Sequence, residues 1–187
     1  MKQSFILVTA LLASTVAQAA PEIYVIDNMH TYPRFEYSHF GFSTQQSRFD
    51  QTSGTITIDR VAKTGSMVVR IDARSVNTGS ILNEHIQAEE FFDTKKYPEI
   101  TFRSDDFRFD GERLVTVNGT LTIKGIARPV TLTVTSFHCM LHPMANKDAC
   151  GANATTQLKR SDFNMGKYAP YVSDDVKLTI SVEAIKP

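Results

Sequence analysis

The fold is decided by residues 75–102, SVNTGSILNEHIQAEEFFDTKKYPEITF, where a long β-type pattern is interrupted once. Apolar side chains from Ile81 to Phe92 recur at the three-to-four-residue spacing of one helical face. Ser80 is a suitable N-cap for a helix, and Pro98 ends the helical pattern and favours an extended chain after it. The stretch predicts one short amphipathic helix, which is too little to build a second layer but enough to close the end of a barrel.

Period-two alternation of apolar and polar side chains dominates the chain on both sides of this stretch. It predicts about eight strands, over residues 34–39, 55–59, 66–72, 100–109, 115–123, 130–134, 154–158 and 176–182. Asp110-Gly111 is typical of a tight hairpin turn, and Asn118-Gly119 comes so soon afterwards that it indicates a bulge. The pattern therefore predicts a mainly β fold, an antiparallel barrel of about eight strands with one short capping helix. A β-sandwich is the alternative, because alternation alone does not distinguish the two.

The amino-terminal residues have the pattern of a cleaved export signal. Lys2 is followed by a short apolar core, and Ala17-Gln18-Ala19 is a small-x-small cleavage site. The apolar core is shorter than the roughly 20 residues needed to span a bilayer. We expect residues 1–19 to be removed and residues 20–187 to form a single domain in the periplasm, without a permanent membrane anchor.

The charge balance argues against two classes of partner. The whole chain has 20 basic and 20 acidic side chains, so its formal net charge is zero. Nucleic acids and anionic membrane surfaces are bound through a basic face. Neither is therefore expected as the main partner.

The cysteines are Cys139 and Cys150, in the segment CMLHPMANKDAC. In an exported chain two nearby cysteines usually pair, and the bond would contribute about 3 kcal/mol by limiting the unfolded chain. His138 and His142 lie beside them, and imidazole with thiolate also suits zinc or copper. Because oxidation would consume both thiolates, we predict a structural disulfide and no metal site.

Several separated motifs in this order resemble the YceI-like family of exported, lipocalin-like proteins that bind polyisoprenoid lipids. They are FEYSHFGFS (35–43), TGSILNEHIQAEEFFDTKKYPEITF (78–102), VNGTLTIKGIARPVTLTV (117–134), SDFNMG (161–166) and DDVKLTISVEAIK (174–186). The resemblance covers nearly all of the expected mature chain. It implies a barrel with a long apolar tunnel for a prenyl chain, such as the tail of ubiquinone, with a polar head near the mouth. It implies a bound lipid and no catalytic cofactor.

Candidate ligand-binding residues follow from this resemblance combined with strand parity. The predicted tunnel walls are Phe35, Tyr37, Val69, Ile71, Phe102, Leu121, Ile123 and Leu132, and the predicted seal is Phe91 and Phe92. Pattern alone would favour the alternative that these side chains fill a solid core, and the family resemblance reverses that preference. His39 and His85 are candidates to meet the polar head, and the alternative is that they are buried, hydrogen-bonded structural histidines.

The sequence contains no Gly-x-Ser-x-Gly elbow, zinc-protease helix or phosphate-binding loop. We therefore expect a lipid-binding or carrier protein and not an enzyme, although a hydrolase stays as a remote alternative. The competing class is a ligand-free stress or interaction module. Oligomeric state, including a homodimer, is left open.

Overall fold

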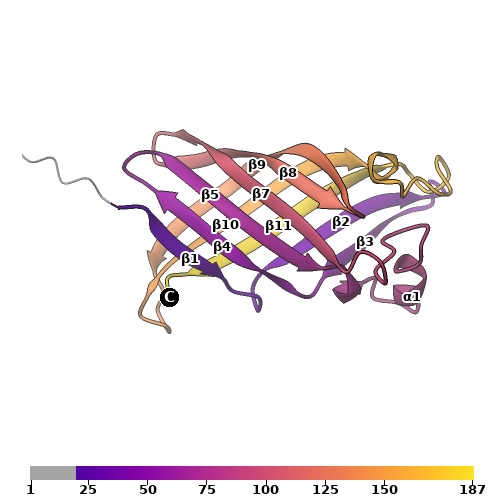
Figure 1. Ribbon diagram of the computed structural model, residues 1–187, viewed down its shortest axis with the longest axis horizontal. Coiled ribbons are helices and arrows are strands. Elements are labelled where there is room, and N and C mark those ends of the chain that lie inside the picture. The colour runs from indigo at the N-terminus through magenta and orange to yellow at the C-terminus, as the bar shows by residue number, and fades with distance from the viewer. Residues whose placement is uncertain (1–19) are drawn as a thin grey trace, which may run out of the picture.

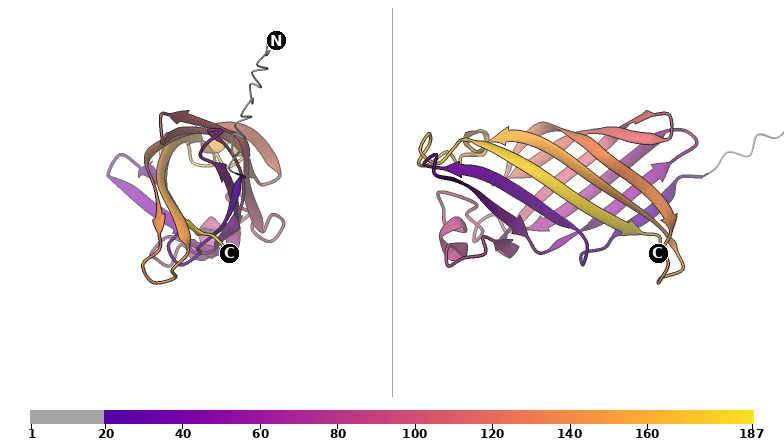
Figure 2. Two further views of the ribbon diagram at one scale, coloured as in Figure 1. Left: turned by 90° about the vertical axis from the view of Figure 1, so that its left-hand side faces the viewer. Right: turned by 180° about the vertical axis from the view of Figure 1, so that it is seen from behind.

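The protein is a barrel whose ring strands lie side by side in chain order, and each neighbouring pair of ring strands is antiparallel. The computed structural model describes residues 20–187 (Figure 1). Eight strands form the ring: β1 (Glu22–Ile26), β4 (Thr52–Asp59), β5 (Thr64–Asp72), β7 (Glu99–Asp110), β8 (Arg113–Ile123), β9 (Ile126–Leu141), β10 (Asp148–Lys159) and β11 (Asp175–Ile185). Pairing of β1 with β11 closes the ring, which Figure 2 shows end-on. The sequence-based prediction of an eight-stranded barrel is confirmed, and the sandwich alternative is excluded.

Three further strands extend the wall at one end. They are β2 (Tyr32–His39), β3 (Ser43–Phe49) and β6 (Val76–Asn77), which continue β1, β4 and β5 after short interruptions. β11 pairs with β1 through Ile185 and Ala184, and then with β2 along residues 177–181. Each of these pairs of strands therefore acts as one long, bent strand.

The interruptions lie next to one another and form a seam across three strands, at residues 27–31, 50–51 and 73–75. Backbone N–H groups that lose their strand partners at the seam donate to side chains there, because buried backbone polar groups need hydrogen bonds. The Thr52 N–H donates to the Asn28 side chain, and the Gln51 N–H donates to the Ser75 hydroxyl. The seam bends the wall without leaving these backbone donors unpaired.

The barrel on the β1 and β4 side of the seam holds the hydrophobic core. Inward-facing side chains of β1, β4, β7, β8, β10 and β11 are buried there, among them Tyr24, Ile58, Phe107, Val117 and Ala184, and inward side chains of β5 and β9 are partly buried against them. Burial of such side chains stabilises the fold by about 1.5–3 kcal/mol each before ordering costs. This half is the core of the molecule.

The strand predictions differ from the structure in particular places. β1, β3 and the short β6 were not predicted, and β9 and β10 are far longer than residues 130–134 and 154–158. The turn at Asp110-Gly111 is confirmed. The bulge near Asn118-Gly119 is also confirmed, but the extra residue lies on β7, where Ser104 and Asp105 are opposite Gly119. A Cβ on Gly119 would lie 2.5 Å from the Arg103 carbonyl oxygen, so glycine permits this close approach.

The predicted twelve-residue helix is wrong in its length and in its cap. Only α1 (Asn83–Ile86) is helical; its N-cap is Leu82, and no side chain caps it. After Ile86 the chain changes to turns, in which the Phe92 N–H donates to the Ile86 carbonyl and the Thr94 N–H to the Gln87 carbonyl. These turns carry Phe92 inward to a buried position, whereas Ile81 is 95% exposed. The gain from burying Phe92 prevails over helical periodicity, although the segment still lies across one end of the barrel (Figure 1).

No helix within residues 20–187 is both long and apolar enough to cross a bilayer. The predicted export signal, residues 1–19, lies outside the described residues.

Candidate functional site

The half of the barrel beyond the seam encloses a cavity of about 410 Å³. Its walls come from β2, the ends of β7 and β8 nearest α1, β10, β11 and the segment containing α1. Ligand pockets usually measure about 300–1,000 Å³. The cavity is therefore large enough for a small molecule or for part of a long apolar chain.

Nine of the twelve predicted ligand-binding residues line this cavity. They are Phe35, Tyr37, His39, Ile71, His85, Phe91, Phe92, Leu121 and Ile123. Strand parity brings the aliphatic members and Phe35 inward, while the turns after α1 bring in Phe91 and Phe92. The structure places them together around one space; their contact with a ligand stays a prediction.

Three predicted wall residues lie outside this cavity. Phe102 is buried, and Val69 and Leu132 are half-buried against the hydrophobic core. Their inward parity is as predicted, but they pack with the hydrophobic core of the other half of the barrel. Parity identifies the inner face of a strand and does not tell where along the strand the filling ends.

Aromatic side chains form the floor of the cavity. The Phe92 ring lies 5.9 Å from Phe35 and 5.3 Å from Phe49, measured between centroids, and both pairs meet edge to face. All three rings are buried. This cluster joins the segment after α1 to β2 and β3, so the end of the cavity is fixed by packing.

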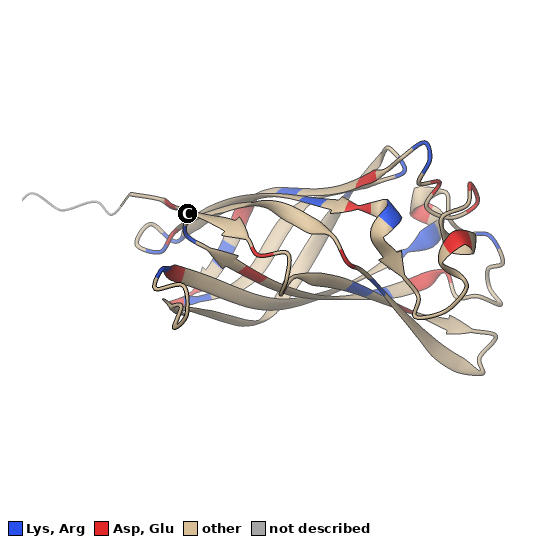
Figure 3. Cartoon of the chain, turned by 90° about the horizontal axis from the view of Figure 1, so that it is seen from below, with Lys and Arg blue, Asp and Glu red and all other residues tan. Residues whose placement is uncertain are grey.

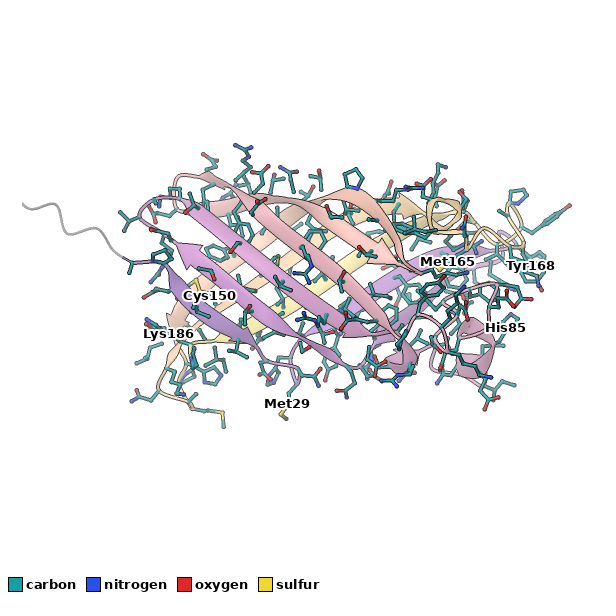
Figure 4. The ribbon with its side chains drawn as sticks, viewed as in Figure 1. Met29, His85, Cys150, Met165, Tyr168 and Lys186 are labelled. Atoms are coloured by element: carbon teal, nitrogen blue, oxygen red, sulfur yellow. A yellow bond between two sulfur atoms is a disulfide. The ribbon has the colours of Figure 1, made fainter. Side chains whose placement is uncertain are left out.

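The mouth of the cavity is ringed by exposed apolar side chains from three separate loops. Phe40, Leu82 and Tyr168 line the cavity and are each about half exposed, and Phe42 and Tyr171 flank them. The Phe40 ring stacks 6.3 Å from Phe42 and 6.0 Å from Tyr171. His85, Met165 and Tyr168 are labelled at this end of the molecule in Figure 4.

The two candidate histidines are neither buried nor hydrogen-bonded through their rings. His39 and His85 are both exposed at the mouth, where they meet Phe40 and Phe91 edge to face. The alternative of buried structural histidines is therefore wrong. Both side chains border the cavity, but at its rim and not in its interior.

Arg160 is the functional candidate that was missed from the sequence. It lines the cavity and is 8% exposed. Its guanidinium donates to the carbonyl oxygens of Ser173, Val172, Met165 and Lys167, and thereby orders the loop between β10 and β11. Burial lowers the pKa of Arg160. Parity could have identified it, because Arg160 continues the inward series of Ala154, Thr156 and Leu158.

The opposite end of the barrel holds the disulfide. Cys139 on β9 and Cys150 on β10 are directly paired residues, with Cα atoms 4.1 Å apart, and the predicted bond is confirmed. Figure 4 labels Cys150 on this side, far from His85. The segment between the two cysteines is the tip of the long hairpin formed by β9 and β10. Since both sulfurs are bonded, the alternative thiolate metal site is ruled out.

One group of metal-type donors lies at the turn between β1 and β2. Single donor atoms of Asp27, His30 and Glu183 lie within 4.8 Å of one another. The Asp27 carboxylate already accepts from the Met29 N–H and contacts His30 Nδ1 at 2.6 Å. We assign it a structural role in this turn. Elsewhere charges of both signs are interspersed, as Figure 3 shows for one side.

Comparisons with known proteins agree with this architecture. Residues 24–184 match the model of the YceI-like domain. The chain is 32% identical to protein YceI of Escherichia coli O157:H7 over 191 residues, which covers 100% of this chain and 99% of that protein. A UPF0312 protein of Pseudomonas putida (strain W619) is 34% identical over 181 residues, covering 95% and 93%.

Solved structures share the fold. BcnA of Burkholderia cenocepacia superposes with a TM-score of 0.71 at 25% identity, covering 85% of this chain and 99% of that one. A YceI protein of Campylobacter jejuni gives 0.68 at 29%, covering 80% and 90%. A polyisoprenoid binding domain of Saccharophagus degradans gives 0.62 at 22%, covering 88% and 98%. With a family match over most of its length and full-length relatives above 30% identity, this chain belongs to the YceI-like family.

Proposed function

We propose that this protein binds a polyisoprenoid lipid, such as a ubiquinone, and carries it in the periplasm. The apolar tail would lie in the cavity behind the mouth, with the head nearer the mouth. The observation that carries the proposal is the cavity itself, a space of about 410 Å³ in one half of the barrel that is lined mainly by aliphatic and aromatic side chains.

Two further observations support the lipid class. Members of the same fold include a protein described as a polyisoprenoid binding domain. The cavity wall is aliphatic and aromatic, so binding would come mainly from removing apolar surface from water, at about 0.8 kcal/mol for each buried methylene before ordering costs. A chain of repeated apolar units is suited to such a wall.

Extraction of the native protein with organic solvent, followed by mass spectrometry, tests the proposal directly. We expect an isoprenoid in stoichiometric amount. Leu121→Trp, which fills the cavity from β8, should abolish the bound lipid, whereas Thr120→Trp on the exposed face of the same strand should retain it. Circular dichroism should show an unchanged β-sheet in both. Lipid-free wild-type protein that also fails to take up added isoprenoids would instead favour an interaction module.

The location is tested separately. If residues 1–19 are an export signal, protein released by osmotic shock should begin at Ala20 when its amino terminus is sequenced. Protein that retains Met1 and stays with the cell interior would contradict export.

A further inference from the structure

Three hydroxyl side chains of the described residues line the cavity, those of Tyr37, Thr78 and Tyr168. Thr78 borders the cavity, but its hydroxyl contacts Ser80 and Asn83. His39, His85 and Tyr168 are exposed at the mouth. Among the remaining cavity residues, only Tyr37 offers a free hydroxyl in a half-buried setting.

The Tyr37 hydroxyl lacks a hydrogen bond to any side chain or backbone group of residues 20–187, although its ring is fixed on β2. The ring stacks 6.3 Å from Phe35, measured between centroids. Burial raises the pKa of Tyr37, so its hydroxyl stays protonated and can donate at neutral pH. A hydroxyl left unpaired in an apolar site costs free energy that a suitable acceptor would recover.

Arg160 lines the same cavity as Tyr37 and carries a positive charge. Its N–H groups all point to backbone carbonyl oxygens, and no carboxylate oxygen of the described chain lies within 4.0 Å of its nitrogens. Asp174, the acidic residue that acts on it at longer range, is hydrogen-bonded to the N–H and hydroxyl of Ser161. The positive charge of Arg160 acts to lower the pKa of Tyr37, which opposes the larger effect of burial. Since a cation in an apolar wall is screened less than one in water, its field extends into the cavity.

We propose that Tyr37 and Arg160 form a polar anchor, in which Tyr37 donates a hydrogen bond to an electron-rich oxygen at the head of the lipid and Arg160 supplies the favourable field. The ligand class is therefore an apolar chain that ends in an acceptor oxygen, either a quinone carbonyl or an anionic phosphate oxygen. This inference rests on the proposed function, because it requires an isoprenoid in the cavity. Tyr37 and Arg160, and not His39 and His85 at the rim, are then the groups that select the head of the lipid.

The test uses three probes with the same farnesyl chain: a ubiquinone with a farnesyl tail, farnesyl phosphate, and the hydrocarbon farnesene. Each is titrated into lipid-stripped wild-type protein, Tyr37→Phe, and the control Tyr97→Phe, which removes the hydroxyl of a half-buried tyrosine that does not line the cavity. Tyr37→Phe should weaken binding of at least one oxygen-bearing probe by roughly three- to tenfold, the effect of one lost hydrogen bond. It should leave farnesene unchanged, and Tyr97→Phe should leave all three unchanged.

Infrared spectroscopy adds a readout that packing alone would not move. The carbonyl stretch of the bound quinone should lie at lower frequency in the wild-type protein than in Tyr37→Phe. If the phosphate is the probe that weakens, the head is anionic; if the quinone weakens, it is neutral. Equal affinities of Tyr37→Phe and wild type for both oxygen-bearing probes would overturn the anchor while leaving the proposed function intact. Failure of all three probes to bind wild-type protein would overturn both.

Discussion

Phe92 shows how one side chain fixes the local course of the chain. It is buried between Phe35 and Phe49, whereas Phe91 beside it is half-buried and Ile81 is almost fully exposed. Ile81 and Phe92 share the helical stripe that the sequence displays, yet the structure gives them different energetic roles. Spacing predicts which side chains are apolar neighbours, and only packing decides which of them is buried.

Replacing Phe92 by alanine should lower the free energy of unfolding by about 3–5 kcal/mol, because a buried ring is lost and a void is left. Chemical denaturation measures this. Ile81→Ala is the matched control from the same segment and should change stability by less than about 0.5 kcal/mol. Equal effects of the two substitutions would show that the segment does not pack as described.

The contact between Asp27 and His30 should be detectable in the pKa values of the two side chains. The hydrogen bond from His30 lowers the pKa of Asp27, and the same contact raises the pKa of His30 above 6.5. The histidine contribution to stability is therefore fully present below pH 6.5 and is lost as the pH rises through the raised pKa. The aspartate contribution is present above its unfolded pKa and is lost as the pH falls through the lowered one. NMR titration should find the His30 pKa raised in the wild type and returned towards 6.5 in Asp27→Asn; an identical curve in both proteins would refute the contact.

At the scale of elements, strands with one buried face were predictable and the others were not. β1 has apolar side chains on both faces, since Tyr24 and Ile26 point inward while Ile23 and Val25 are exposed, so no alternation is visible. β3 is exposed along most of its length and is largely polar for that reason. The end of β9 carries His138 and Met140, and the turn after it carries His142, Pro143 and Met144, so this part of the sequence mimics a loop. Parity found part of the cavity wall, such as Phe35, Ile71 and Leu121, and Arg160 shows that a charged residue in an inward series can belong to the site.

The hairpin of β9 and β10 should depend on its disulfide. Closing a loop of this length stabilises by about 3 kcal/mol, chiefly through the unfolded chain. The double variant Cys139→Ala, Cys150→Ala should therefore melt at a lower temperature than the wild type in non-reducing buffer. Adding a reductant should lower the melting temperature of the wild type alone. Lipid content should be the same in both proteins, because the bond lies at the end away from the cavity.

For the molecule as a whole, the seam separates a packed half from a hollow half. β3 pairs with β2 on one side and with only two residues of β6 on the other, whereas β5, β7 and β8 are flanked along most of their length. Local opening should therefore cost less in the hollow half. This division was not predictable from the sequence, because the inward residues of both halves are equally apolar.

Hydrogen exchange followed by mass spectrometry should show faster exchange in β2 and β3 than in β5, β7 and β8. Adding an isoprenoid should slow exchange in β2 and in the segment around α1, and should leave β7 beyond Phe107 unchanged. Uniform protection of all strands, with or without lipid, would contradict the division into two halves.

The direction of the chain has a practical consequence. β1 begins and β11 ends at the end of the barrel away from the mouth (Figure 1). A protein coupled to a sensor surface through its carboxyl terminus would therefore point its mouth into the solution, with the disulfide end against the support. Reversed attachment, through a cysteine introduced at Ser43, the first residue of β3 after its turn from β2, would press the mouth against the support and block entry. Used together, the two attachments would report lipid uptake, because protein attached through its carboxyl terminus would give the signal and protein attached through residue 43 would give the blank.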